Sequence, residues 1–233
     1  MKYYYETHLH TAPVSGCARW SATEAVHYYK DAGYAGIFIT NHFLDNDMTE
    51  IRMLPYETQI QLYFKDYEEG LAAGREVGLP VFCGIEITYK GSDFLVYGLD
   101  KAWYLAHPEI DGMPIKDFLA LARENGALVV HAHPFREGGA IDHIRLYPRS
   151  VDAVEIHNAN RPEFEHTQAI WYAKNYGKIL FAGSDFHGKE PHGLRYGVCT
   201  ETEVTDEQDF VKKVLAGETD VFCRTLDPFV RKE

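Results

Sequence analysis

The chain has 233 residues, of which 45% are hydrophobic and 25% charged, and 35 acidic against 23 basic side chains give it a formal charge of −12. This length accommodates one large α/β barrel, and we expect a single domain over residues 1–233. Such an acidic protein repels phosphate backbones, which argues against long nucleic acid as a partner.

The sequence also predicts the cellular setting. No apolar run approaches the roughly 18 residues of a membrane helix, and no hydrophobic leader precedes the first strand-like segment. The four cysteines are scattered without C-x-x-C spacing. We therefore expect a cytoplasmic protein with reduced thiols and no contact with a membrane.

The predicted elements alternate between strands and helices. Apolar runs rich in β-branched and aromatic residues predict strands, and amphipathic segments that end at glycine predict helices. The expected strands cover residues 3–10, 34–40, 81–88, 94–98, 127–133, 151–158 and 178–187, one from 196, and 220–223. The expected helices cover residues 21–32, 55–78, 114–125, a segment ending near 176, and 206–216. This alternation implies a mostly parallel sheet, and parallel barrels carry their chemistry at the carboxyl ends of the strands.

The first strand ends in residue types that bind metals. His8 and His10 stand two positions apart, so their side chains share one face of a strand. Two neutral imidazoles on one face are the usual beginning of a transition-metal site. A pair of exposed histidines would give the same pattern, and the ends of the later strands favour the metal site.

Later strands also carry potential metal ligands at or near their carboxyl ends. Glu86 interrupts an apolar run, where a carboxylate is costly to bury unless it is paired or binds metal, and a carboxylate can bridge two ions. Asp185 and His187 form a second pair two positions apart, and His42 directly follows the second strand. His192, in the loop beyond, is a candidate supporting residue.

Three further histidines compete for places at the mouth of the barrel. His133 stands just before Pro134, nearer the mouth than His131, so we favour His133 as a ligand and His131 as a hydrogen-bonded core residue. His157 either faces the mouth or flanks it.

In this order, H-x-H at 8–10, T-x-H at 40–42, G-x-E at 84–86, H-P at 133–134 and G-S-D-x-H at 183–187 resemble the polymerase and histidinol phosphatase (PHP) family. The resemblance implies a distorted (β/α)7 TIM-like barrel that acts as a stand-alone phosphoesterase with two or three divalent ions, Zn, Mn or Fe. It also implies that His8, His10, Glu86 and Asp185 hold the first ion, that Glu86 bridges to a second ion with His133, and that His42 and His187 hold a third.

The chain departs from the family pattern at three positions. Cys17 stands in the loop after the first pair, where many members have His or Asp, so either it supplies a soft ligand or the third site is incomplete. Asp93 stands near a position that is often His, and an oxygen ligand there would favour Mn or Fe over Zn. Asn41 replaces the usual Asp, and the loss of charge could weaken the support of His42.

The reading that follows is a metal-dependent hydrolase of a small phosphomonoester or phosphodiester, with a hydroxide that bridges clustered metals as the nucleophile. Arg19, Arg136 and Arg195 are candidate ligands of the substrate phosphate. An amidohydrolase-type hydrolase of C–N bonds or lactones is the alternative, because that class also begins with H-x-H. It commonly uses a modified lysine as the bridging ligand, for which Lys90 is the candidate. A non-catalytic metal-binding barrel is the remaining reading.

Overall fold

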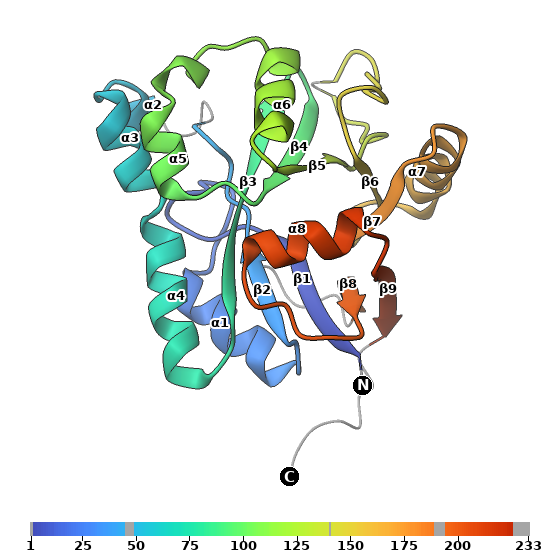
Figure 1. Ribbon diagram of the computed structural model, residues 1–233, viewed down its shortest axis with the longest axis horizontal. Coiled ribbons are helices and arrows are strands. Elements are labelled where there is room, and N and C mark those ends of the chain that lie inside the picture. The colour runs from blue at the N-terminus through green and yellow to red at the C-terminus, as the bar shows by residue number, and fades with distance from the viewer. Residues whose placement is uncertain (1, 45–48, 140, 189–193, 226–233) are drawn as a thin grey trace.

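The computed structural model describes residues 2–44, 49–139, 141–188 and 194–225. The strands of the described residues form one twisted sheet, in which they follow the order β7-β6-β5-β4-β3-β2-β1-β8-β9 (Figure 1). The strands are β1 (Tyr3–Leu9), β2 (Gly36–Ile39), β3 (Val81–Tyr89), β4 (Ser92–Tyr97), β5 (Leu128–Ala132), β6 (Ala153–Asn158), β7 (Ile179–Gly183), β8 (Leu194–Thr200) and β9 (Thr219–Thr225).

The sheet is less parallel than the sequence predicts. Neighbouring strands are parallel at β1–β2, β2–β3, β5–β6 and β6–β7. They are antiparallel at β3–β4, β4–β5, β1–β8 and β8–β9. A tight turn at Lys90 and Gly91, both with positive φ, joins β3 to β4 and leaves no room for a crossover helix. The expected seven-stranded (β/α)7 count is therefore wrong for the described residues, although the barrel class holds.

The sheet curls until its ends approach each other. The backbone amide of His10 donates to the carbonyl of Phe186 at 2.9 Å, and the amide of Phe186 donates to the carbonyl of His8 at 3.3 Å. These bonds join the chain beyond β1 to the chain beyond β7 and nearly close a barrel. The carboxyl ends of β1, β2, β3, β5 and β7 consequently surround one mouth.

Helices cover the outside of the barrel. They are α1 (Ala22–Asp31), α2 (Thr49–Arg52), α3 (Tyr56–Tyr63), α4 (Lys65–Val77), α5 (Lys101–Ala106), the 3-10 helix η2 (Pro108–Ile110), α6 (Ile115–Glu124), α7 (Glu163–Asn175) and α8 (Glu207–Leu215). The Ser21–Glu24 capping box starts α1 as predicted. The single helix expected over residues 55–78 is two helices that meet at Phe64. None of the helices in the described part of the chain has the length and apolar character needed to cross a bilayer.

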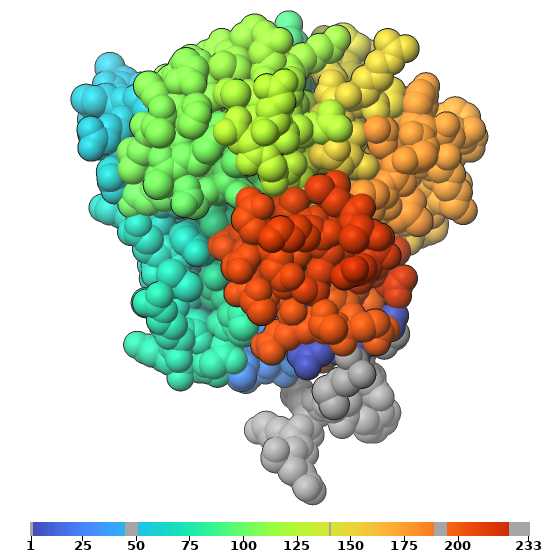
Figure 2. Space-filling view, viewed as in Figure 1, coloured from blue at the N-terminus to red at the C-terminus, as the bar shows by residue number. Residues whose placement is uncertain are grey.

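An aromatic core fills the barrel below its mouth. Phe38, Tyr97 and Phe181 project from three strands onto Phe210 of α8, with ring centroids 4.3–6.2 Å apart. The carboxylate of Glu207 accepts a hydrogen bond from the amide of Cys83 at 2.9 Å and fixes α8 to β3. Figure 2 shows the red-orange residues around α8 lying against the green residues around α5 and α6. Because aromatic side chains fill the barrel below the mouth, the side chains at the mouth lie above an apolar core.

Candidate metal centre

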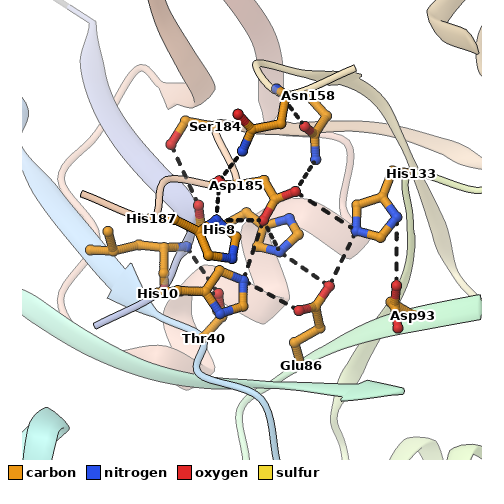
Figure 3. A network of polar contacts seen from close by, with 12 residues as sticks. His8, His10, Thr40, Glu86, Asp93, His133, Asn158, Ser184, Asp185 and His187 are labelled. Carbon is orange, nitrogen blue, oxygen red and sulfur yellow. Dashed lines mark hydrogen bonds and ion pairs between the residues drawn. The ribbon is translucent and has the colours of Figure 1, made fainter. Parts of the chain in front are cut away.

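Seven of the side chains predicted as metal ligands meet at the mouth of the barrel (Figure 3). Each comes from the carboxyl end of a strand or from the loop that directly follows it. They are His8, His10, His42, Glu86, His133, Asp185 and His187.

The Glu86 carboxylate is the hub of this cluster. Its Oε1 lies 3.2 Å from Nε2 of His8 and 3.3 Å from Nε2 of His133. Its Oε2 lies 3.3 Å from Nε2 of His10 and 3.0 Å from Nδ1 of His42. The side chain points into the barrel and is only 1% exposed. Each oxygen therefore faces two imidazoles, an arrangement in which one carboxylate can bridge two cations.

Asp185 faces the same space from the opposite wall. Its Oδ1 lies 3.3 Å from Nε2 of His10 and 3.5 Å from Nε2 of His8. Its backbone has φ of +55°, in the left-handed region that Asp and Asn adopt more readily than other non-glycine residues. The amide of Asn158 donates to Oδ2 at 3.3 Å and helps to hold the carboxylate in place.

A register shift in β1 turns both of its histidines inward. The pairing with β2 slips between Glu6 and Leu9. Tyr5 packs in the barrel core, whereas Leu9, which strict alternation would place on the same face, packs outside against α1 and α4. The irregularity gives the inward positions to His8 and His10, whose ring centroids are 5.2 Å apart.

Gly183 makes room for the first of these histidines. A Cβ on Gly183 would stand 2.4 Å from Cβ of His8 and 3.0 Å from Oε1 of Glu155. We expect Gly183→Ala to displace His8, to destabilise the fold by about 1–3 kcal/mol and to weaken metal binding. Thermal unfolding and metal titration would measure the two effects. Gly138→Ala is the matched control, because a Cβ there meets nothing within 4 Å; equal behaviour of the two variants would contradict the packing argument.

Glu155 is the main residue that the sequence analysis missed. It is 1% exposed, and its Oε1 accepts from Nδ1 of His8 at 2.8 Å. Its Oε2 accepts from the backbone amide of His133 at 2.9 Å and from the side-chain amide of Asn158 at 3.0 Å. A carboxylate that receives Nδ1–H of a histidine leaves Nε2 free to bind a cation and fixes the ring. The available signal was a carboxylate within an apolar strand, the same signal that identified Glu86.

The position of His157 corrects the prediction for β6. Regular alternation would put Glu155 and His157 on the same face, but the register with β7 shifts between them. His157 consequently turns toward His166, at a ring-centroid distance of 5.2 Å, and Asn158 takes the place facing Asp185. His157 therefore lies outside the cluster, and His192 lies outside the described residues.

Ser15 links the loop after β1 to the ring of His10. Its hydroxyl donates to the side-chain oxygen of Asn41 at 3.0 Å. The hydroxyl oxygen of Ser15 in turn accepts from the backbone amide of His42 at 3.0 Å and lies 3.2 Å from Nδ1 of His10. Because the hydroxyl proton is already donated, Nδ1–H of His10 is the donor in the last contact, and Nε2 is left free.

Asn41, which stands where the family pattern has Asp, supports the loop after β1. The side-chain oxygen of Asn41 accepts from the amide of Thr11 at 2.7 Å and from the hydroxyl of Ser15 at 3.0 Å. A carboxylate lies beyond Asn41, on Asp66 of α4. It accepts from the hydroxyl of Thr11 and from the backbone amide of Val14. Asn41 therefore supports the backbone at His42 through Ser15.

Electrostatics keeps both carboxylates of the cluster ionised. Burial acts to raise the pKa of Glu86, but the charges of His8 and His42 outweigh it and hold that pKa well below its usual range. The pKa of Asp185 is lowered in the same way, against its burial, mainly by His8 and His10. Burial acts to lower the pKa of His42, but Glu86 and Cys17 raise it to about 11. Cation binding at these imidazoles would compete with their protonation, because a histidine binds metal in its neutral form.

The donor atoms fit divalent cations. Nε2 of His8, Nε2 of His10, Nδ1 of His42 and both oxygens of Glu86 are buried and have no hydrogen-bond partner among the described residues. Ligand atoms that share an ion lie roughly 3.4 Å apart for tetrahedral bonds of about 2.1 Å, close to the contacts measured at Glu86. Three groups have ligand atoms within 4.8 Å of one another: His8, Glu86 and His133; His8, His10 and Asp185; and His10, Cys17, His42 and His187.

Asp93 lies behind His133, away from Glu86. Its Oδ2 is 3.7 Å from Nδ1 of His133 and 2.9 Å from Nη2 of Arg136. The three groups of converging ligand atoms do not include it. Burial, followed by the Glu86 carboxylate, raises the pKa of Asp93, which is 1% exposed. The geometry makes Asp93 a partner of His133 and Arg136. His131 is buried in the core against Phe94 as expected, but neither of its ring nitrogens has the expected hydrogen-bond partner among the described residues.

A polar cavity of about 410 Å³ opens above the cluster. Its lining residues are Cys17, Arg136, Asn160, Arg161, Asp185, Phe186 and His187. Of the three arginines predicted to bind substrate, only Arg136 reaches this cavity, where it is joined by Arg161, which the sequence analysis missed.

Two predicted arginines and the candidate lysine lie elsewhere. The guanidinium of Arg195 stacks over Tyr34 at 5.9 Å, because it leaves β8 on the side facing the α1–β2 connection. Arg19 is exposed, and its backbone amide donates to the carbonyl of His187 at 2.9 Å. Lys90 is exposed in the β3–β4 turn, over Tyr89, so it does not supply the bridging lysine that the amidohydrolase reading requires.

Structure comparison gives clear matches for this architecture. The chain resembles a two-domain protein from Bacteroides vulgatus that contains a predicted PHP-like metal-dependent phosphoesterase, with a TM-score of 0.66 and 14% identity. The match covers 95% of this chain and 65% of that protein, so this chain spans less than two thirds of it. The chain has a PHP-like barrel fold.

Two further structures share the fold. A protein from Bifidobacterium adolescentis assigned as a metal-dependent phosphoesterase has a TM-score of 0.58 and 15% identity, with 93% of this chain and 96% of that chain covered. An amidohydrolase from Chromobacterium violaceum, with bound sulfate and no metal, has a TM-score of 0.52 and 14% identity, with 78% and 87% covered. Neither a comparison with protein-family models nor one with curated proteins gives a match.

Proposed function

We propose that this PHP-like barrel is a metal-dependent phosphoesterase that acts on a small phosphorylated substrate. The observation that carries the proposal is the pairing of two kinds of group at one cavity. Asp185 and His187 of the candidate metal cluster form its floor, and Arg136 and Arg161 stand on its wall. A cation-binding floor next to two guanidinium groups suits a phosphate ester, whose oxygens can contact both.

In this proposal, different residues bind the cations, fix the histidine tautomers and bind the substrate. His8, His10, Glu86 and Asp185 would hold one cation, Glu86 and His133 a second, and His42 and His187 a third. Cations held there would lower the pKa of a water molecule and neutralise charge on the phosphate oxygens. Glu155 and Ser15 fix the tautomers of His8 and His10, so that both Nε2 atoms face the cluster. Arg136 and Arg161 would bind and orient the ester.

Two observations support an anionic substrate. The protein carries a formal charge of −12, yet the cavity is lined by two arginines. The structurally similar amidohydrolase from Chromobacterium violaceum holds sulfate, an anion of the same tetrahedral shape as phosphate. A small ester that enters the 410 Å³ cavity fits better than a polymer.

Hydrolysis of model esters tests the function. Metal-free protein is reconstituted separately with Zn²⁺, Mn²⁺ and Fe²⁺, and turnover of p-nitrophenyl phosphate, bis-p-nitrophenyl phosphate and p-nitrophenyl acetate is followed. We expect metal-dependent release from one of the phosphate esters that stops on chelation and returns with metal. Protein that binds metal but turns over only the carboxylic ester would contradict the proposal.

Arg136 should act on substrate affinity. We expect Arg136→Lys, which keeps a positive charge beside Asp93, to raise KM for the phosphate ester roughly tenfold to hundredfold with a smaller change in kcat. The physical reason is the loss of the bidentate guanidinium. Steady-state kinetics measure the split, and Arg75→Lys on the exposed face of α4 is the control. A change confined to kcat would show that Arg136 does not bind the ground-state ester.

A further inference from the structure

Cys17 gives one part of the cluster a different chemistry from the rest. Its ligand atom lies within 4.8 Å of those of His10, His42 and His187. The other two groups of converging ligand atoms each contain a carboxylate, from Glu86 or Asp185, whereas this one has only imidazoles and a thiol. Cys17 is exposed and lines the cavity, so this group faces the space where substrate would enter.

The loop after β1 is built to hold the thiol there. The amide of Ser15 donates to the carbonyl of Thr11 at 3.0 Å, and the amide of Ala18 donates to the carbonyl of Ser15 at 2.9 Å, so the segment forms two successive turns. The Ser15 hydroxyl accepts from the amide of His42 at 3.0 Å and ties the loop to the end of β2. Cys17 is thereby presented next to His42.

His10 belongs mainly to the carboxylate side of the cluster. Its Nε2 lies 3.3 Å from Oε2 of Glu86 and 3.3 Å from Oδ1 of Asp185, and its Nδ1 is held by Ser15. Nδ1 of His42 also lies 3.0 Å from Oε2 of Glu86, but, unlike His10, it is not paired with Asp185 among the described residues. That assignment leaves Cys17, His42 and His187 as three ligands, two of which, Cys17 and His187, line the cavity. Three protein ligands with one open position are the usual pattern of a catalytic zinc site.

We propose that Cys17, His42 and His187 form a thiolate-containing cation position that selects zinc-like ions over manganese and magnesium. Thiolate is a soft ligand that favours zinc and related ions, while carboxylate and water suit the harder ones. The Cys17 thiol would lose its proton to solvent when the cation binds. The proposal rests on the metal centre of the proposed function, but it concerns which ion this position takes and not which bond is cleaved.

Cobalt titration gives a readout that does not depend on activity. A Co²⁺ ion bound to thiolate absorbs in the near ultraviolet through sulfur-to-cobalt charge transfer, in addition to its visible d–d bands. We expect this charge-transfer band in the wild type and in Cys223→Ser, whose side chain is exposed elsewhere on β9. In Cys17→Ser the band should disappear while the d–d bands of the carboxylate-bound positions remain. Saturating cobalt without the band in the wild type, or the same band in Cys17→Ser, would overturn the proposal.

Alkylation provides an independent measurement. In Cys223→Ser, Cys17 is the one exposed cysteine, because Cys83 and Cys199 are buried. We expect Zn²⁺ to slow iodoacetamide modification of Cys17, detected by peptide mass spectrometry, by roughly tenfold or more, because the coordinated sulfur is a poor nucleophile. An equal concentration of Mn²⁺ should protect much less. Equal rates with and without Zn²⁺ would contradict a thiolate ligand.

These results separate the two proposals. Phosphoester turnover without a charge-transfer band would leave the proposed function standing and remove the thiolate position. The band and zinc protection without phosphoester turnover would establish the position and remove the function. Circular dichroism of Cys17→Ser checks that the exposed loop residue is not needed for folding.

Discussion

Replacing Glu86 by glutamine is expected to reduce kcat/KM for a phosphate ester by more than about 100-fold, beyond the effect typical of residues that only support a metal ligand. The substitution preserves the size of the side chain, but it removes the charge that faces His8, His10, His42 and His133. An amide cannot bridge two cations as a carboxylate does. Metal content measured by elemental analysis should fall together with activity.

Glu207→Gln is the control for this experiment. Glu207 also bonds to β3, through the amide of Cys83, but it does so at the end of the barrel opposite to the cluster. It should lower stability without changing metal content. If Glu86→Gln retained the metals of the wild type, Glu86 would not be the bridging ligand and the arrangement of the centre would have to be revised.

Glu155→Gln should weaken metal binding and turnover by roughly 10–100-fold although Glu155 belongs to none of the three groups of converging ligand atoms. Its two oxygens accept from Nδ1 of His8 and from the amides of His133 and Asn158. Whichever way the new amide turns, its NH₂ group faces one of these donors. The tautomer of His8 or the backbone at His133 then loses its support.

The matched variant for Glu155 is Asp152→Asn, just before the start of β6. Asp152 accepts from the amide of Val129 at 3.1 Å and pairs with Arg123 at 2.7 Å, remote from the cluster. We expect it to lower the unfolding temperature and to leave the metal affinity unchanged. Competition titration against a chromophoric chelator measures that affinity. Equal affinities in Glu155→Gln and the wild type would show that His8 needs no carboxylate partner.

Local pattern predicted most of the elements because their signals are local. The capping box at Ser21 and the left-handed Gly78 mark helix ends in the sequence and in the structure. The helix predicted over residues 55–78 broke at Phe64 because the side chains there pack into the core around α5 and α6, which a local pattern does not contain. The antiparallel β4 similarly follows from the positive φ values at Lys90 and Gly91.

The candidate metal cluster was predictable in outline because its members lie near the carboxyl ends of strands. Parallel strands bring these ends to one side of a barrel, so His8, His42, Glu86, His133 and Asp185 were expected near one mouth. Arg195, which was predicted to bind substrate because it follows a metal-ligand motif in the sequence, lies over Tyr34 instead. The reason is that β8 runs antiparallel to β1.

By itself, the sequence determined the residue types at the strand ends and therefore predicted a candidate metal site at the mouth. Only the tertiary structure decided which of them face inward, because a slip of one residue in strand pairing reverses every side chain beyond it. The slip in β1 turned His8 and His10 into the barrel, and the slip in β6 exchanged His157 for Asn158. The same long-range packing brought Glu155 to His8 and Cys17 to His42, contacts between segments that no local pattern connects.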